Sequence, residues 1–408
     1  MPTDGLLVSR DVMRKIKLDS VTQHTPQIFR VLNLNNLYVE WLPDQSILVP
    51  ITTIQEVQVF DRYIRSDLDN LYPIYSSDLM NIVGEKNLFI PENQVLEPND
   101  VVAIDLNKKN LNVLLRASDT HHTLFLTNRC NNYCIMCSQP PTKHDDSWLI
   151  EQALEIIDHL SYVPMNIGLT GGEPLLLDKN LRLIIDTIHH KFPSTKIDVL
   201  TNGRLFSNSE VAESILSNLE TQVNWLIPLY GHADLLHDFV VQQHSAFEET
   251  LEGFYVLQNY EQPIQLRIVL VKPVLENLLN LCNYIRSNLP FINEVAFIGC
   301  EPIGFALANR ELSQVDIKEW WKELENAADI LINSKIRFIF MNIPLCCLPE
   351  NLWDFAAQSI SDWKNTYDPV CQECDLRGKC CGLFSWYKNG WMPSTIKPIK
   401  LLKPSMNN

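Results

Sequence analysis

The sequence lacks any uninterrupted apolar run of the ~18 residues that a membrane-spanning helix needs. The first residues, Met1 to Gly5, also lack the basic and then apolar segments of a secretory signal peptide. We therefore expect a protein that stays in the cytoplasm, where thiols are reduced. In such a compartment the 11 cysteines indicate metal ligands or catalytic groups before disulfides. No internal repeat or low-complexity segment is present.

Basic residues are scarce, with 33 Lys and Arg against 49 Asp and Glu and a formal net charge of -16. So acidic a surface repels a phosphate backbone, which disfavours a nucleic-acid partner and favours a polypeptide or a small molecule. The 46% hydrophobic and 20% charged residues are typical of a soluble globular protein. A chain of 408 residues is longer than a single domain with one hydrophobic core usually is, so two or three domains are expected.

Residues 1–118 contain no cysteine and no catalytic motif. Short apolar runs separated by turn residues predict a β-rich N-terminal domain over this range. The predicted strands are 28–32, 37–41, 47–51, 101–104 and 111–115, with a turn at Glu97–Asp100. This domain either packs against the rest of the chain or adds a substrate peptide to its sheet edge.

From His122 onward, short apolar strands alternate with amphipathic helices. This pattern predicts an α/β fold, a partial (β/α)6 TIM-like barrel over residues 119–310, with parallel strands inside and helices outside. The predicted strands are 122–127, 166–170, 196–201, 223–228, 264–270 and 293–298, and the helices 148–160, 178–191, 209–219, 246–259 and 275–288. Chemistry in barrels takes place at the carboxyl ends of the strands.

Three cysteines follow the first predicted strand with the spacing C-x3-C-x2-C, namely Cys130, Cys134 and Cys137. Three thiolates in one loop can hold three corners of an iron–sulfur cube, and no fourth cysteine lies nearby in sequence. One iron would then be open to a ligand that is not protein. Zinc is the alternative metal, but a structural zinc site needs four protein ligands, and this loop offers three.

Two more motifs lie at the next strand ends. Gly171–Pro174 follows the second strand, and Thr201–Gly203 ends the third. The glycines let the backbone approach a ligand, and Glu173 can accept hydrogen bonds from a cationic amine, although each motif could also be an ordinary turn. No catalytic residue is assigned; Arg267 and Glu301 are candidates for the barrel mouth, or are solvated at its rim.

The C-terminal extension, residues 311–408, begins with a predicted helix at 315–331 and a strand at 335–340 and is rich in cysteine. Together its cysteines offer enough thiolates to close a complete metal site. The predicted ligands are Cys346, Cys371, Cys374 and Cys380, with Cys347 and Cys381 as alternates. Their spacing alone does not separate zinc from an iron–sulfur cluster.

The segment Leu124–Pro141, together with Gly171–Pro174, resembles the radical S-adenosylmethionine (SAM) superfamily. The segments Glu301–Ala306 and Asn342–Cys346 and the tail to Gly382 are similar to peptide-modifying maturases of that superfamily, above all to the C-type maturase of the His-Xaa-Ser repeat system. This resemblance implies a 4Fe-4S cluster whose open iron binds the amine and carboxylate of SAM. It also implies an auxiliary 4Fe-4S cluster in the tail.

The resemblance also implies roles for single residues. Gly171, Gly172 and Glu173 would contact the methionyl amine, Pro174 would stiffen the turn, and Thr201–Gly203 would lie near the ribose. Met136 takes the place of the aromatic residue that the family usually has before the third cysteine, and its soft side chain could lie against adenine.

The reaction that the resemblance implies is reductive cleavage of SAM to a 5'-deoxyadenosyl radical, which abstracts hydrogen from a polypeptide with His-Xaa-Ser repeats. Its implied partners are that polypeptide, a companion radical SAM maturase and an electron donor. Two alternatives remain open. One is a radical SAM enzyme acting on a small molecule or RNA, similar to a molybdenum-cofactor cyclase, and the other is a non-enzymatic iron–sulfur protein.

Overall fold

A computed structural model describes residues 14–17, 28–63, 70–84, 87–92, 94–105, 110–361, 364–387 and 391–401. Met1 to Gly5, used above to argue against a signal peptide, lie outside the described residues. The chain forms two compact units. The first comprises Met1–Leu126, Asp146–Leu169 and Leu183–Ile197, and the second comprises Thr127–Asp145, Thr170–Arg182 and Asp198–Asn408.

The first unit contains a seven-stranded sheet of order β1-β7-β6-β2-β3-β4-β5. Its strands are β1 (Arg14–Lys17), β2 (Ile28–Val31), β3 (Ile47–Ile51), β4 (Leu71–Ser76), β5 (Leu88–Ile90), β6 (Val101–Asp105) and β7 (Asn110–Leu115). Strands β2 to β5 pair in parallel, and β6, β7 and β1 join them antiparallel. Leu48 packs in one apolar cluster, while its neighbours Ile47 and Val49 pack in another. Both faces of this sheet are therefore buried.

The predicted strand at 37–41 is wrong, because Leu37–Glu40 forms the helix α1. In that helix Leu37 is buried while Tyr38 and Val39 are 79% and 86% exposed, so the run does not alternate as a strand would. The other four predicted strands of this region are confirmed as β2, β3, β6 and β7. The turn at Glu97–Asp100 is confirmed by a hydrogen bond from Asp100 N to Glu97 O.

A second sheet, seven-stranded, has the order β14-β13-β12-β11-β10-β9-β8. Its strands are β8 (His122–Phe125), β9 (Asn166–Thr170), β10 (Lys196–Leu200), β11 (Val223–Pro228), β12 (Ile264–Leu270), β13 (Glu294–Gly299) and β14 (Arg337–Met341). All six predicted strands are confirmed. The strand predicted at 335–340 becomes β14, which pairs in parallel with β13.

Helices follow most of these strands. The five predicted ones are confirmed as α4 (Trp148–His159), α5 (Lys179–Lys191), α6 (Ser209–Leu216), α8 (Ala246–Asn259) and α10 (Leu278–Asn288). The helix predicted at 315–331 begins as a 3-10 turn, η5 (Ile317–Trp320), and continues as α13 (Trp321–Asn333). The remaining α-helices described are α2 (Ile54–Tyr63), α3 (Met80–Val83), α7 (Asp234–Val241), α9 (Lys272–Leu275), α11 (Phe305–Ala308) and α12 (Arg310–Ser313). None of the helices in the described residues is long and apolar enough to cross a membrane.

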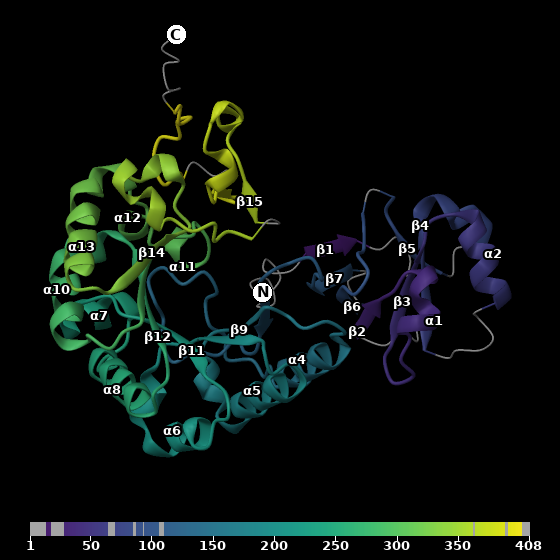
Figure 1. The fold of residues 1–408 in the computed structure, drawn as a ribbon, viewed down its shortest axis with the longest axis horizontal. Coiled ribbons are helices and arrows are strands. Elements are labelled where there is room, and N and C mark those ends of the chain that lie inside the picture. The colour runs from purple at the N-terminus through teal and green to yellow at the C-terminus, as the bar shows by residue number, and fades with distance from the viewer. Residues whose placement is uncertain are drawn as a thin grey trace, which may run out of the picture. The chain divides into compact units, whose positions relative to one another are not determined.

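In the second unit the parallel strands curl, with α6, α8, α10 and α13 on their outer side (Figure 1). Strand β12 has two different faces. Its buried residues are Ile264, Leu266, Ile268 and Leu270, and the residues between them, Gln265, Arg267 and Val269, are partly exposed. Arg267 pairs in register with Pro228 on one side and Ala296 on the other. The α/β fold with a curled, half-barrel sheet is thus as predicted, and it is followed by a cysteine-rich end containing the short strands β15 (Asn365–Thr366) and β16 (Leu383–Phe384).

Candidate functional site

The segment Thr127–Thr142, called the cysteine loop below, packs directly on the Gly-Gly-Glu motif. Gly172 N donates to Thr127 O at 2.7 Å, and Glu173 N donates to Arg129 O at 2.8 Å. A Cβ atom on Gly171 would lie 2.5 Å from Thr127 O, and one on Gly172 would lie 2.2 Å from Arg129 O. Only glycine fits at these two positions, because the two backbones touch there.

Glu173 is fully buried, and both of its carboxylate oxygens are used within the chain. Oε1 accepts from Leu175 N at 2.9 Å and from the Thr201 hydroxyl at 2.5 Å, and Oε2 accepts from Asn202 N at 2.6 Å. Burial raises the pKa of Glu173, and these hydrogen bonds act in the opposite direction. Glu173 therefore joins the segment after β9 to the segment after β10, a role that the sequence did not predict.

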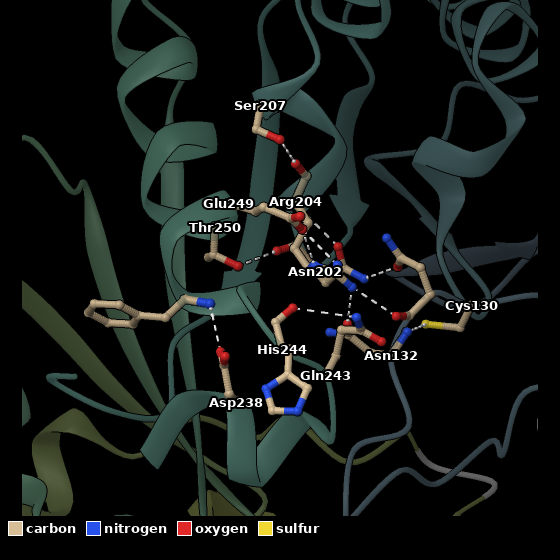
Figure 2. Close-up of polar contacts among 12 residues, drawn as sticks. Cys130, Asn132, Asn202, Arg204, Ser207, Asp238, Gln243, His244, Glu249 and Thr250 are labelled. Atoms are coloured by element: carbon tan, nitrogen blue, oxygen red, sulfur yellow. Dashed lines mark hydrogen bonds and ion pairs between the residues drawn. The ribbon is translucent and has the colours of Figure 1, made fainter. Parts of the chain in front are cut away.

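The third motif reaches the cysteine loop through side chains. Asn202 Nδ2 donates to Asn131 Oδ1 at 2.6 Å. Arg204 Nη1 donates to Asn131 O at 2.8 Å and to Asn132 Oδ1 at 2.6 Å, while its Nε donates to Glu249 of α8 at 2.7 Å. Figure 2 shows the Arg204 side chain between Glu249 and Asn132. Gly171–Glu173, Thr201–Gly203 and the cysteine loop thus meet at one place, as their positions at successive strand ends predicted.

The three cysteines of the loop are free thiols of intermediate exposure. Asn132 N donates to Cys130 Sγ at 3.4 Å, and Cys137 N donates to Cys134 O at 3.0 Å. Burial raises the pKa of Cys130 to about 12, helped by the Glu173 carboxylate, and burial also raises the pKa of Cys134 and of Cys137.

Three crowded thiolates need a cation to neutralise them, and a cluster held by cysteine thiolates supplies that positive charge. A backbone N–H directed at a cysteine sulfur is also typical of such ligands. The donor set therefore fits an iron–sulfur cluster. Among the described residues, no group of three or more His, Cys, Asp or Glu side chains is arranged to hold a single metal ion.

The cysteine loop is also held from α7. Tyr133 N donates to Val241 O at 3.0 Å, and Ile135 N donates to Val240 O at 2.9 Å. Both acceptors are carbonyls of the last turn of α7, which have no partner inside the helix. The positions of Cys134 and its neighbours therefore depend on this helix.

The loop after β13 holds the third cysteine. Phe305 N donates to Cys137 O at 2.8 Å, and Asn309 Nδ2 donates to Ile135 O at 2.9 Å. Gly304 has a φ of +60°, and a Cβ there would lie 2.3 Å from Cys137 O. The segment Glu301–Ala306, which carried part of the sequence resemblance, thus packs against the cysteine loop.

The other predicted pocket residues lie as follows. Met136 is buried, at 7% exposed, and Pro174 is buried in the first turn of the 3-10 helix η3 (Pro174–Leu177). Burial lowers the pKa of Arg267, with the charges of Tyr230 and others opposing it, and burial raises the pKa of Glu301. Arg267 and Glu301 are close enough to influence each other's pKa, but no hydrogen bond joins them in the described structure.

The tail brings four of its cysteines to one pocket. These are Cys346, Cys371, Cys374 and Cys380, the set that the sequence predicted as ligands. Leu345 N and Gly382 N each donate to Cys380 Sγ at 3.4 Å, and Ile399 N donates to Cys374 Sγ at 3.4 Å. The pocket therefore offers four sulfurs, and backbone N–H groups are directed at those of Cys374 and Cys380.

The two alternates, Cys347 and Cys381, are buried and do not line that pocket. The adjacent Cys347 side chain lowers the pKa of Cys346 to about 7, and the adjacent Cys381 side chain lowers the pKa of Cys380 to about 6. The lowered pKa values favour the thiolate form of Cys346 and Cys380.

Sequence reasoning missed Arg204, Asn131 and Asn132, which tie the loop to the third strand end, and it missed His237 on α7. His237 is 1% exposed; its Nδ1 accepts from Tyr230 N at 3.2 Å, and its ring stacks on that of Tyr230. Burial, followed by the charge of Arg204, lowers the pKa of His237 from 6.5 to about 3. The signal for Arg204 was its place directly after Thr201–Gly203.

His237 makes stability depend on pH. Because its pKa is depressed by folding, the unfolded chain binds a proton between about pH 6.5 and about pH 3 that the folded chain does not. We expect the contribution of His237 to stability to be complete above about pH 6.5 and to be lost progressively below it, on the order of several kcal/mol by about pH 3. His237→Gln keeps an acceptor for Tyr230 N and cannot titrate, so it should lose less over this window. Urea denaturation at several pH values measures both, and equal losses would contradict this assignment.

Three comparisons place these findings among known proteins. A model of the Radical SAM superfamily matches residues 124–285. An uncharacterized protein of Methanocaldococcus jannaschii is 30% identical over 196 residues, which are 46% of this chain and 62% of that protein.

Among solved structures, SuiB of Streptococcus suis bound to S-adenosylmethionine is 12% identical, with a TM-score of 0.43 over 54% of this chain and 50% of that one. A radical SAM methyltransferase from Sphaerobacter thermophilus is 14% identical, with a TM-score of 0.42 over 60% of this chain and 74% of that one. The chain thus spans about half of SuiB and less than two thirds of its curated relative. The matched residues 124–285 contain the cysteine loop, the Gly-Gly-Glu motif and the Arg204 network.

Proposed function

We propose that this protein is a radical SAM enzyme that cleaves SAM reductively and modifies a peptide. The observation that carries the proposal is the meeting of three free thiols, Cys130, Cys134 and Cys137, with Gly171–Glu173 and Thr201–Gly203 inside the matched domain. Three thiolates and no fourth in the loop leave one iron of a 4Fe-4S cluster for a ligand that is not protein.

The residues of the chain have separate tasks in this proposal. The three thiolates hold the cluster, and the backbone of Gly171 and Gly172, which is partly exposed, approaches the methionyl group of SAM. Glu173 and Asn202 fix that backbone, and a bound amine would share a Glu173 oxygen that is already hydrogen-bonded. When bound, the cluster supplies the electron that breaks a sulfur–carbon bond of SAM and gives a 5'-deoxyadenosyl radical.

A polypeptide is the substrate that we propose, on two grounds. The net charge of -16 disfavours nucleic acid, and the segments Glu301–Ala306 and Asn342–Gly382 resemble peptide maturases. More narrowly, we propose a polypeptide with His-Xaa-Ser repeats, modified in the cytoplasm with a companion maturase and an electron donor. Arg267 and Glu301 are proposed to face that substrate, because Arg267 lies on the partly exposed face of β12.

A second, auxiliary 4Fe-4S cluster is proposed for the tail pocket. Its support is the convergence of Cys346, Cys371, Cys374 and Cys380 on one pocket and the backbone N–H groups directed at two of their sulfurs. Four thiolates would close the coordination of that cluster, so it would serve to accept electrons or to anchor substrate rather than to bind SAM.

SAM cleavage tests the proposed activity. Anaerobically reconstituted protein, given SAM and dithionite, should release 5'-deoxyadenosine, and Cys130→Ala, Cys134→Ala or Cys137→Ala should each abolish it. Cys282→Ala is the matched control, because Cys282 is buried in α10 and should leave release near the wild-type rate. If the wild type releases none with any reductant, the proposed function is wrong.

Iron analysis tests the auxiliary cluster. We expect about eight irons per wild-type chain and about four in the double variant Cys371→Ala, Cys374→Ala, because one of two four-iron clusters is lost. Cys347→Ala and Cys381→Ala should keep about eight, since neither thiol lines the pocket. A wild-type content of about four irons, or of zinc in the tail, would rule this cluster out.

A further inference from the structure

The guanidinium of Arg204 is a buried cation with a carboxylate on one side. Arg204 begins the 3-10 helix η4 (Arg204–Ser207) directly after Gly203, whose φ of +75° turns the chain out of the third motif. Its side chain is 7% exposed and forms a salt bridge at 2.6 Å with Glu249, whose side chain is 39% exposed. The cation is thus shielded from water more completely than its partner.

On its other side Arg204 contacts the cysteine loop at two oxygens. Nη1 donates to Asn131 O at 2.8 Å and to Asn132 Oδ1 at 2.6 Å. The backbone N–H of the same Asn132 donates to Cys130 Sγ at 3.4 Å (Figure 2). A continuous chain of polar contacts therefore runs from Glu249 through Arg204 and Asn132 to the first cysteine sulfur.

We propose that Arg204 is a positioning residue for the cluster, and that the Arg204–Glu249 pair sets the reduction potential of that cluster. Arg204 fixes the turn at Asn131–Asn132 so that Asn132 N–H points at Cys130 Sγ. This inference rests on the proposed function only in requiring that Cys130, Cys134 and Cys137 hold a cluster.

The sign of the effect follows from charge. Reduction adds one electron, so a nearby positive charge stabilises the reduced cluster and raises its potential, while a negative charge lowers it. A hydrogen bond to a ligating sulfur acts in the same direction as the positive charge. Groups that orient and polarise the ligands in this way tune a metal site without binding it. Because Arg204 is buried and Glu249 faces water, the field of Arg204 is the less screened of the two.

The two partners are therefore predicted to have opposite effects. Arg204→Gln removes the positive charge and the guanidinium that donates hydrogen bonds to Asn131 and Asn132, so it should lower the reduction potential. Glu249→Gln leaves an oxygen for Arg204 Nε but removes the negative charge, so it should raise the potential. Arg204→Lys keeps the positive charge but loses the planar set of guanidinium donors. The reduction potential of the cluster in this variant should lie between those of the wild type and Arg204→Gln.

The experiment is a redox titration followed by electron paramagnetic resonance. It uses the full-length chain carrying Cys371→Ala and Cys374→Ala, so that only the cluster on Cys130, Cys134 and Cys137 titrates. Arg182→Gln is the control: Arg182 is also an arginine that binds carbonyls, those of Ile215, Ser217 and Asn218 at the end of α6, and its loss should leave the potential unchanged.

Shifts of Arg204→Gln and Glu249→Gln in the same direction, or no shift in either, would overturn the inference. An equal shift in Arg182→Gln would overturn it as well. If Arg204→Gln holds no iron, Glu249→Gln decides, and it must raise the potential. If the wild-type protein cleaves SAM but Arg204→Gln and Glu249→Gln have the wild-type reduction potential, this inference alone is disproved. If the wild-type protein binds no cluster, the proposed function is disproved too.

Discussion

The arrangement of the site depends on one buried carboxylate. Glu173 has no exposed surface, and an ionised carboxylate in such a place is stable only if both oxygens are hydrogen-bonded. Its donors come from its own segment, at Leu175, and from the next motif, at Thr201 and Asn202. The carboxylate can be satisfied only when those two segments lie side by side. Folding of one motif is thereby coupled to folding of the other.

The position of the cysteine loop is fixed by its contacts with those two segments. Gly171 and Gly172 touch its backbone so closely that no Cβ fits between them, and Asn202 and Arg204 bind it through side chains. Carbonyls of α7 and the N–H of Phe305 hold it from other sides. A loop bound in this way presents its thiols with little freedom, which is what a cluster needs from ligands on a short irregular segment.

The sequence was sufficient for the parts that depend on local pattern. Apolar strands alternating with amphipathic helices predicted every strand from β8 to β13, because burial on one face imposes the period on the sequence. It failed at Leu37–Glu40, where an apolar run forms a helix that buries Leu37 and leaves Tyr38 and Val39 exposed. It also overlooked α2, although Thr53 and Glu56 form a reciprocal hydrogen-bonded cap that a Thr-x-x-Glu pattern announces.

The residues that position the site were harder to predict, for a physical reason. The hydrogen bond from Arg204 to Asn132 joins residues 72 positions apart, and that from Asn202 to Glu173 joins residues 29 apart. Neither leaves a periodic or compositional signal. Glu173 was identified as a residue of the site, but its bonds to Thr201 and Asn202 became visible only in the fold. The tail was easier, because cysteines at short spacing are rare enough to indicate a site by themselves.

The central claim is that three cysteines hold a cluster with one iron open to SAM. Mössbauer spectroscopy of iron-57 protein tests it most directly, in the variant Cys371→Ala, Cys374→Ala, which retains only this cluster. One of the four irons should differ from the other three, and its spectrum should change when SAM is added. Four equivalent irons that do not respond to SAM would contradict the account.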